Sequence, residues 1–178
     1  MEYSESAHRP LHVYADHTWY FITSATVRRA HLLSTTVHLN IWLTELLSIV
    51  ADLKIELAAW AVLENHYHLL LEFQRGRDLT KLMKSLHGRT SYQFNRMDHA
   101  RGRQVWYSYW DNCIRSDDDF WTRFNYIHYN PVRHGYVQCP EDWEFSSYRS
   151  YLQEGGQEWL AECLQGHPEV NLRPEDDF

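Results

Sequence analysis

Four polar residues of this chain have the types and spacing that phosphodiester chemistry requires. His66 and His68 form a His-x-His pair, and Tyr126 precedes Asn130 by four residues further along the chain. Two neutral imidazoles can chelate one divalent cation, and an amide oxygen could join them. A phenol has an unperturbed pKa of about 10, so Tyr126 needs assistance to act as a nucleophile at neutral pH. A nearby cation would polarise the scissile phosphate and stabilise the charge of the transition state.

The ligand types limit the choice of metal and of reaction. Imidazole and carbonyl ligands together suit magnesium or manganese with waters completing the shell, and zinc stays open as an alternative. Attack by a tyrosine would give a phosphotyrosine ester, which permits rejoining, whereas simple hydrolysis would need only water. Each residue also has a plainer interpretation, because His-x-His pairs are often structural and a tyrosine or asparagine can belong to a core or a helix end.

The histidine pair is predicted to lie on a strand over residues 66–73. Because side chains alternate along a strand, His66 and His68 share one face and Tyr67 points to the other. A turn at residues 64–65 connects this strand to another over 56–63, so the two should form a hairpin.

The tyrosine is predicted to lie on a helix that starts at Ser116. Three aspartates follow this serine in the first turn, where they oppose the helix dipole, and Pro131 is expected to end the helix near Asn130. Tyr126 and Asn130 then share one side of the helix. At about 100° per residue this side flanks the apolar stripe, so the pair should border the core without filling it; the stripe is Phe120, Phe124 and Ile127.

The remaining hydrophobic patterns complete a β-α-β-β-α-β-α order. Strands are expected over 17–23 and 105–114 and helices over 36–52, capped by Ser34 or Thr35, and 78–95, capped by Asp78. The inward residues of the second helix are expected to be Leu79, Leu82, Met83, Leu86 and Tyr92. This order predicts an α+β fold: a ferredoxin-like antiparallel sheet with helices on one side, plus an appended C-terminal helix carrying the tyrosine. We expect one domain over residues 1–151 and an acidic C-terminal extension over 152–178, with a short amphipathic piece around 159–164.

Composition favours a folded protein outside the secretory pathway. Of 178 residues, 44% are hydrophobic and 15% aromatic, and the three cysteines are widely spaced. This pattern indicates a globular domain in a reducing, cytoplasmic setting. We expect no membrane partner, because there is neither a signal pattern at the N-terminus nor an apolar run of 18 residues.

The formal net charge of −7 conceals a polarised chain. Residues 75–115 carry nine Lys or Arg and three acids, whereas residues 139–178 carry two Arg and ten acids. A basic middle section suits a phosphate-binding face, although a solvated helix with scattered charges would look the same. The candidate DNA-binding residues are Lys81, Lys84, Arg89, Arg96, Arg101, Arg103 and Arg133.

Three segments resemble the single-tyrosine HUH transposases. Residues 60–70 (WAVLENHYHLL) resemble their strand with the motif N-H-x-H-L-L, and residues 125–137 (NYIHYNPVRHGYV) resemble their Y-I-h-x-N-P-V-r-x-G segment. The later 143–148 (WEFSSY) matches W-x-x-S-S-Y. Together with Val105-Trp106 and residues 113–115, the resemblance covers about residues 12–151, and it is closest to the REP-associated tyrosine transposases.

The resemblance implies a metal-dependent single-stranded DNA endonuclease and strand transferase that recognises a palindromic hairpin and nicks beside it. By motif position, Tyr126 would be the nucleophile that forms a 5′-phosphotyrosine, His66 and His68 the metal ligands, and Asn130 the third ligand. Two departures stand out. Leu63-Glu64 replaces the usual Met-Pro, and the acidic net charge implies DNA binding that weakens steeply with salt.

Two other functions remain open from the sequence. One is a protein of the same fold that binds structured single-stranded DNA without cleaving it, and the other is an unrelated metal hydrolase that activates water. The nicking enzyme and the non-cleaving binding protein would both have single-stranded DNA with a hairpin as their partner. The sequence does not decide between a monomer and a homodimer, nor whether tyrosine and histidines meet within one chain or across two.

Overall fold

The computed structural model describes residues 14–165 and 167. Its elements follow the expected order, with two short 3-10 helices and a further C-terminal helix added. They are β1 (Thr18–Thr26), η1 (Val27–Arg29), α1 (Thr36–Leu53), β2 (Glu56–Val62), β3 (His66–Phe73), α2 (Asp78–Met97), β4 (Trp106–Cys113), α3 (Asp117–Arg133), η2 (Pro140–Asp142) and α4 (Tyr148–Gln165). The predicted α+β class and its ferredoxin-like sheet are confirmed.

The four strands form one antiparallel sheet in the order β2-β3-β1-β4. The strand that carries the histidines therefore lies inside the sheet, between β2 and β1. Opposite His68 on β1 is Thr23, and opposite His66 is Ala25. A central strand has both edges hydrogen-bonded, so it is a rigid base for a site.

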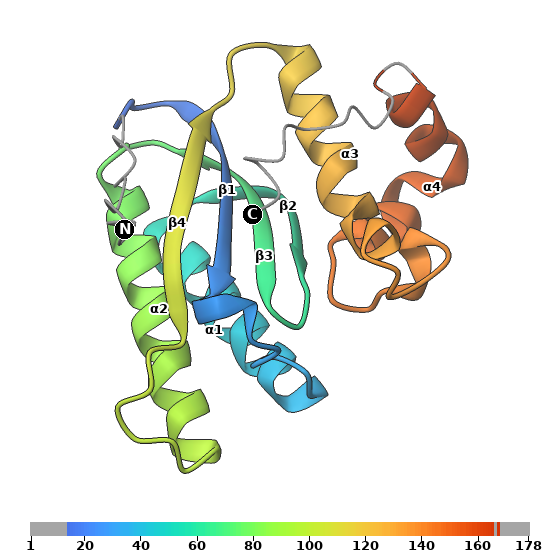
Figure 1. Ribbon diagram of the computed structural model, residues 1–178. Coiled ribbons are helices and arrows are strands. Elements are labelled where there is room, and N and C mark those ends of the chain that lie inside the picture. The colour runs from blue at the N-terminus through green and yellow to red at the C-terminus, as the bar shows by residue number, and fades with distance from the viewer. Residues whose placement is uncertain (1–13, 166, 168–178) are drawn as a thin grey trace, which may run out of the picture.

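Helices cover both faces of the sheet (Figure 1). On one face α1 and α2 pack over inward side chains of β1 and β3, including Tyr20, Tyr67 and Leu69. On the other face α3 and α4 pack over Phe21 and Leu70. The alternation along β3 thus divides the core in two, with the histidines on the α3 side. The predicted helices on one side of the sheet are α1 and α2. The predicted appended helix, which carries Tyr126, is α3, and it covers the opposite side.

Capping explains where the helices begin. The Thr35 hydroxyl accepts a hydrogen bond from His38 N at the start of α1, and the Ser116 hydroxyl accepts one from Asp119 N at the start of α3. Asp78 is the first residue of α2 instead of its cap. Its buried carboxylate binds cations on both sides, Arg75 and Lys81, at 2.9 and 2.6 Å, which hold its pKa below the usual range despite burial.

Two expectations for the helices are wrong. Tyr92 was expected to face inward from α2, but it is 67% exposed. Pro131 was expected to end α3, but the helix continues to Arg133. The φ of proline is itself helical, so Pro131 can lie near the end of α3 at the cost of one missing N–H and of crowding between its ring and the carbonyl four residues before it. The chain closes the last turn beyond it with a bond from His134 N to the Asn130 carbonyl.

The C-terminal part of the described chain is more ordered than its sequence indicated. In place of a short piece around 159–164, α4 runs from Tyr148 to Gln165 with a kink at Gly156, whose φ is 75°. It passes through the expected boundary at residue 151 without a break, and Leu160 belongs to the core on the α3 side. The division into 1–151 and 152–178 stays a prediction, and most of the acidic tail lies outside the described residues. Within those residues, none of the helices has both the length and the apolar character that a bilayer crossing requires.

Candidate active site

The two histidines of β3 lie side by side on the α3 face of the sheet. Their ring centroids are 5.2 Å apart. The Thr23 hydroxyl on the neighbouring strand lies 2.8 Å from Nδ1 of the fully buried His68. When Nδ1–H of an imidazole is hydrogen-bonded in this way, the lone pair lies on Nε2, which is the usual arrangement of a histidine ligand.

His66 is oriented by the turn that precedes it. The Asn65 amide donates from Nδ2 to the Arg29 carbonyl, so its Oδ1 faces His66 Nδ1 at 2.7 Å and accepts from it. The other ring nitrogen, Nε2, lies 3.0 Å from Asn130 Oδ1. A neutral imidazole carries only one N–H, so this second contact joins two acceptor atoms. Such a contact becomes favourable with a shared proton, with a cation bound to both atoms, or with the amide turned so that Nδ2 donates to Nε2.

The Asn130 amide therefore fits a ligand role. Its side chain is fully buried, and its Nδ2 has no hydrogen-bond partner within the described part of the chain. A buried amide with an unsatisfied donor is costly, and sites that are held for function tolerate that cost. Among the described residues, no three His, Cys, Asp or Glu side chains are grouped to hold a metal ion. A cation here would therefore depend on two imidazoles and an amide, which leaves room for water ligands.

Tyr126 joins this group within the same chain. Its ring centroid lies 5.1 Å from that of His68 and 5.9 Å from that of Phe21. The guanidinium of Arg133 lies over the tyrosine ring, 5.1 Å from its centroid. Tyrosine, histidines and asparagine thus meet without a second subunit.

The burial of this pair differs from the prediction. Tyr126 and Asn130 were expected to border the core, but Tyr126 is 1% exposed and Asn130 is fully buried. The prediction considered one helix on a sheet. In the structure the Tyr126 ring packs on the sheet itself, against Phe21 and His68, and Asn130 contacts His66, so this side of α3 faces the sheet.

The segment after α3 fixes that helix to the edge strand β2. Trp60 and Val62 of β2 exchange backbone hydrogen bonds with residues 145–147, at 2.9 and 3.0 Å. The Ser147 hydroxyl accepts from Trp60 N and lies 2.7 Å from Nε2 of the buried His128 on α3. The W-x-x-S-S-Y segment therefore holds the tyrosine helix in place.

Three nearby residues were missed from the sequence. Thr23 and Asn65 orient the two imidazoles, and the exposed His134 has its ring centroid 4.7 Å from that of His66. A sequence signal existed for Asn65, the first residue of the N-H-x-H motif, and for His134, which follows Asn130 by one helical turn. Thr23 could be found only from the strand register.

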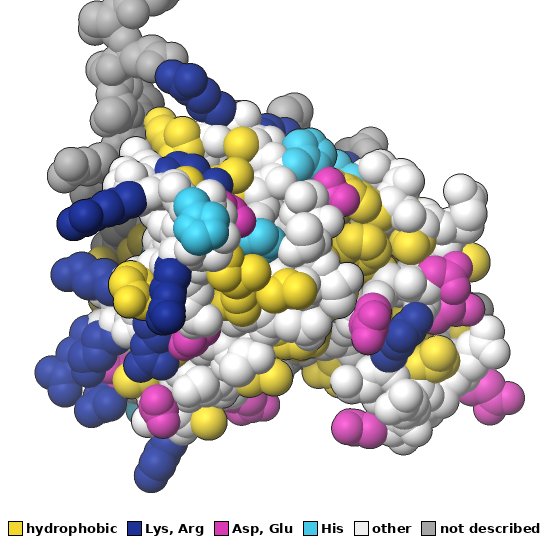
Figure 2. Space-filling view, turned by 90° about the horizontal axis from the view of Figure 1, so that it is seen from below, with side chains coloured by type: hydrophobic (Ala, Val, Ile, Leu, Met, Phe, Trp, Pro, Cys, Tyr) yellow, Lys and Arg dark blue, Asp and Glu magenta, His cyan; other side chains and the backbone are white. Residues whose placement is uncertain are grey.

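Apart from Arg133, which lies over the Tyr126 ring, the candidate DNA-binding residues fall into two groups. Lys81, Arg89 and Arg103 bind carboxylates of the protein itself, Asp78, Glu45 and Asp98 respectively, at 2.6–3.3 Å. Over the described residues, Lys84, Arg96 and Arg101 form no ion pair. Figure 2 shows basic side chains gathered along the α2 side of the lower face and acidic ones toward α4, so the polarity expected from the sequence is present.

Comparison with known proteins identifies the family. Residues 14–130 match the IS200-like transposases. A REP-associated tyrosine transposase of Escherichia coli (strain K12) is 29% identical over 140 residues, which are 78% of this chain and 80% of the relative. A candidate REP-associated tyrosine transposase of Haemophilus influenzae (strain ATCC 51907 / DSM 11121 / KW20 / Rd) is 30% identical over 129 residues, 66% of this chain and 71% of the relative.

The fold agrees with these relatives. A solved REP-associated tyrosine transposase bound to a REP hairpin superimposes with a TM-score of 0.70 and 25% identity, covering 84% of this chain and 87% of that one. The residues quoted for the resemblance lie where the structure forms its histidine strand and its tyrosine helix. The chain therefore belongs to the IS200-like transposase family and, within it, to the REP-associated tyrosine transposases.

Proposed function

We propose that this transposase is a metal-dependent single-stranded DNA endonuclease and strand transferase that binds a palindromic hairpin and nicks beside it through a 5′-phosphotyrosine. The observation that carries this proposal is the meeting of Tyr126 with His68, at 5.1 Å between ring centroids, and of His66 with Asn130. A tyrosine nucleophile fits strand transfer because its phosphodiester can be resealed, whereas a hydrolase needs only water.

His66, His68 and Asn130 are the residues that would hold the cation, magnesium or manganese. That ion would supply Lewis-acid polarisation of the scissile phosphate. The protein contributes orientation: Asn65 holds His66 by Nδ1, and Thr23 holds His68 by Nδ1. Both rings then present Nε2 toward the site, so the ligand atoms are set before DNA arrives.

The proposed reaction is a transesterification. The Tyr126 hydroxyl oxygen attacks the phosphorus and loses its proton, while the bond from phosphorus to the 3′ oxygen of the leaving strand breaks and that oxygen takes up a proton. The phosphate stays attached to Tyr126 and to the 5′ end of the other strand. Attack by a free 3′ hydroxyl on this ester reverses the step and joins the strands.

Access to the tyrosine requires a side-chain movement. Tyr126 is almost fully buried, and exposed Arg133 lies across its ring. A phosphate would attract the guanidinium away from the ring, because a charge-assisted hydrogen bond is stronger than a cation–π contact. We infer that entering DNA recruits Arg133 and uncovers the phenol in the same movement.

The proposed partner is single-stranded DNA with a hairpin, by analogy with the relative solved with a REP hairpin. The basic side chains that form no ion pair with another described residue, Lys84, Arg96 and Arg101, would contact its phosphates. The net charge of −7 makes this contact local, so affinity should fall steeply with salt. Cytoplasmic location, metal identity and oligomeric state stay predictions.

Tyr126→Phe tests the proposal. The substitution removes one oxygen, so we expect loss of the covalent protein–DNA band on a denaturing gel with a hairpin oligonucleotide and manganese, and unchanged hairpin affinity. As a control, His68→Ala should lose cleavage that depends on the metal. Cleavage that persists in Tyr126→Phe would indicate a hydrolase, and a native shift without any cleavage by the wild type would indicate a binding protein.

A further inference from the structure

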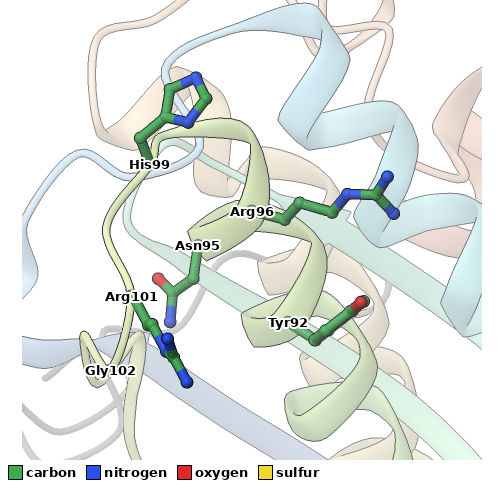
Figure 3. Close-up of a pocket in the computed structure, with 6 residues that line it drawn as sticks. All are labelled: Tyr92, Asn95, Arg96, His99, Arg101 and Gly102. Atoms are coloured by element: carbon green, nitrogen blue, oxygen red, sulfur yellow. The ribbon is translucent and has the colours of Figure 1, made fainter.

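A hollow at the end of α2 is not used by the proposed cutting chemistry. It has a volume of about 550 Å³, within the range of small-ligand pockets. Figure 3 shows Tyr92 and Arg96 leaving the helix on the same side, one turn apart, and Arg101 coming from the segment that follows α2. The lining residues are Tyr92, Asn95, Arg96, His99, Arg101 and Gly102.

The wall of this hollow is held in place by hydrogen bonds. The Asn95 side chain accepts from Arg103 Nε at 2.9 Å and donates to the Arg103 carbonyl at 2.7 Å. Arg103 also binds Asp98 at 2.6 Å, and Asp98 contacts His38 of α1 at 3.1 Å. The segment after α2 is therefore fixed on both the helix and its neighbour, so the hollow is formed before any ligand binds.

The chemistry of the lining suits a base and its phosphates. Tyr92 is 67% exposed, and a second hollow of about 360 Å³ lies on the same Tyr92–Arg96–His99 ridge. Among the described residues that line these two hollows there is no carboxylate. Among the described residues Arg96 and Arg101 have no ion-pair partner. An exposed aromatic ring beside unneutralised guanidiniums is the combination that binds single-stranded nucleic acids.

The hollow and the histidine site lie at the same end of the sheet. Thr26 N donates to the Asn65 carbonyl, next to His66, and Val27 N donates to the Val105 carbonyl, at the end of the segment after α2. Figure 1 shows the end of α2 and the β2–β3 turn at the lower end of the molecule, the face seen in Figure 2. One DNA molecule lying on this face could therefore reach both sites.

We propose that this hollow binds an unpaired nucleotide of the DNA, with its base against the Tyr92 ring and its phosphates at Arg96 and Arg101. The inference rests on the proposed DNA substrate. The nucleotide could come from the hairpin loop or from the single strand beside the stem. In either case the hollow would hold the hairpin in register while the tyrosine site acts on another position.

Tyr92→Ala is the first test, with a labelled hairpin oligonucleotide that carries a single-stranded flank. Loss of one stacked base should weaken binding about tenfold. The matched control is Tyr107→Ala, because Tyr107 is similarly exposed but lies on β4 outside both hollows. Oligonucleotides with a single abasic site in the loop or in the flank then locate the bound nucleotide. When the missing base is the one that stacks on Tyr92, the wild type and Tyr92→Ala should bind with equal affinity.

The double substitution Arg96→Gln, Arg101→Gln tests the phosphate contacts. It should reduce the slope of log affinity against log salt by about two. Wild-type affinity in Tyr92→Ala, or an equal loss toward fully paired DNA, overturns the inference. If Tyr126→Phe keeps its adduct, the proposed cutting role fails, whereas the Tyr92 result still reports on binding.

Discussion

The two faces of the sheet have different contents although one strand supplies both. On the α1–α2 face, β3 contributes Tyr67 and Leu69 to a large apolar core. On the α3–α4 face the same strand contributes His66 and His68, and the smaller core there encloses Tyr126 and Asn130. The alternation of a strand therefore places the chemistry directly behind the most apolar part of the molecule.

This division separates stability from chemistry. A polar group buried with an unsatisfied atom, such as the Asn130 amide, reduces stability. The apolar face can offset that cost without contacting DNA. Substitutions of buried apolar residues on the α1–α2 face should then change stability alone, and equivalent substitutions on the α3–α4 face should change stability and activity together.

A pair of large-to-small substitutions gives the largest expected effect. Trp42 and Phe124 are both buried, and each change to alanine should cost about 3–5 kcal/mol in the free energy of unfolding, measured by urea. Only Phe124→Ala should slow adduct formation per folded molecule, because Phe124 lies on α3 two residues before Tyr126. Equal rates in both variants would contradict the division. Trp42→Phe is the mild control, since it keeps a ring.

Acid should weaken both faces through one neutral histidine on each. Burial lowers the pKa of His87 and of His128 to about 3. In the unfolded chain the pKa of each histidine is about 6.5, so below pH 6.5 the unfolded chain binds more protons than the folded protein. The free energy of unfolding therefore decreases as the pH is lowered, by roughly 3 kcal/mol per histidine at pH 4. The contribution is complete above pH 6.5.

Urea titrations between pH 7.5 and pH 4 measure this effect. Together the two histidines account for one part of the change in the free energy of unfolding between pH 7.5 and pH 4. His87→Gln and His128→Gln should each remove about half of that part. His128→Gln should also slow adduct formation at pH 7.5, because His128 meets Ser147 and helps to hold the tyrosine helix. A pH dependence that is unchanged in both variants would mean that other groups cause the acid sensitivity.

Sequence patterns predicted the fold well because local rules decided most of it. Alternation located β3 at its observed bounds, and Ser116 with its aspartates located the start of α3. Non-local packing caused the failures. Tyr126 and Asn130 are buried against side chains of β1 and β3, and Tyr92 lies outward although the helical pattern placed it inward.

The parts of the site differed in the same way. The pairs His66–His68 and Tyr126–Asn130 follow from spacing within one element. Their meeting depends on residues 145–147 pairing with β2, which no periodicity reveals. The orienting roles depend on strand register and turn geometry, so Thr23 gave no signal in the sequence, and Asn65 stood in the N-H-x-H motif without a predicted role. The roles of the four predicted residues stay predictions, although the structure places them together.

The smallest expected effect concerns the orientation of His68. Thr23→Val keeps the shape of the side chain but removes the hydroxyl beside His68 Nδ1. Loss of such an orienting partner typically weakens metal affinity about 10–100-fold, which a calorimetric titration with Mn²⁺ would measure. Thr23→Ser retains the hydroxyl and should keep most of the affinity. Equal affinities in the valine and serine variants would show that the hydroxyl does not orient a ligand. Thr23 lies opposite His68 on the neighbouring strand β1. A loss of metal affinity in Thr23→Val alone would therefore show that the pairing of β1 with β3 positions a metal ligand.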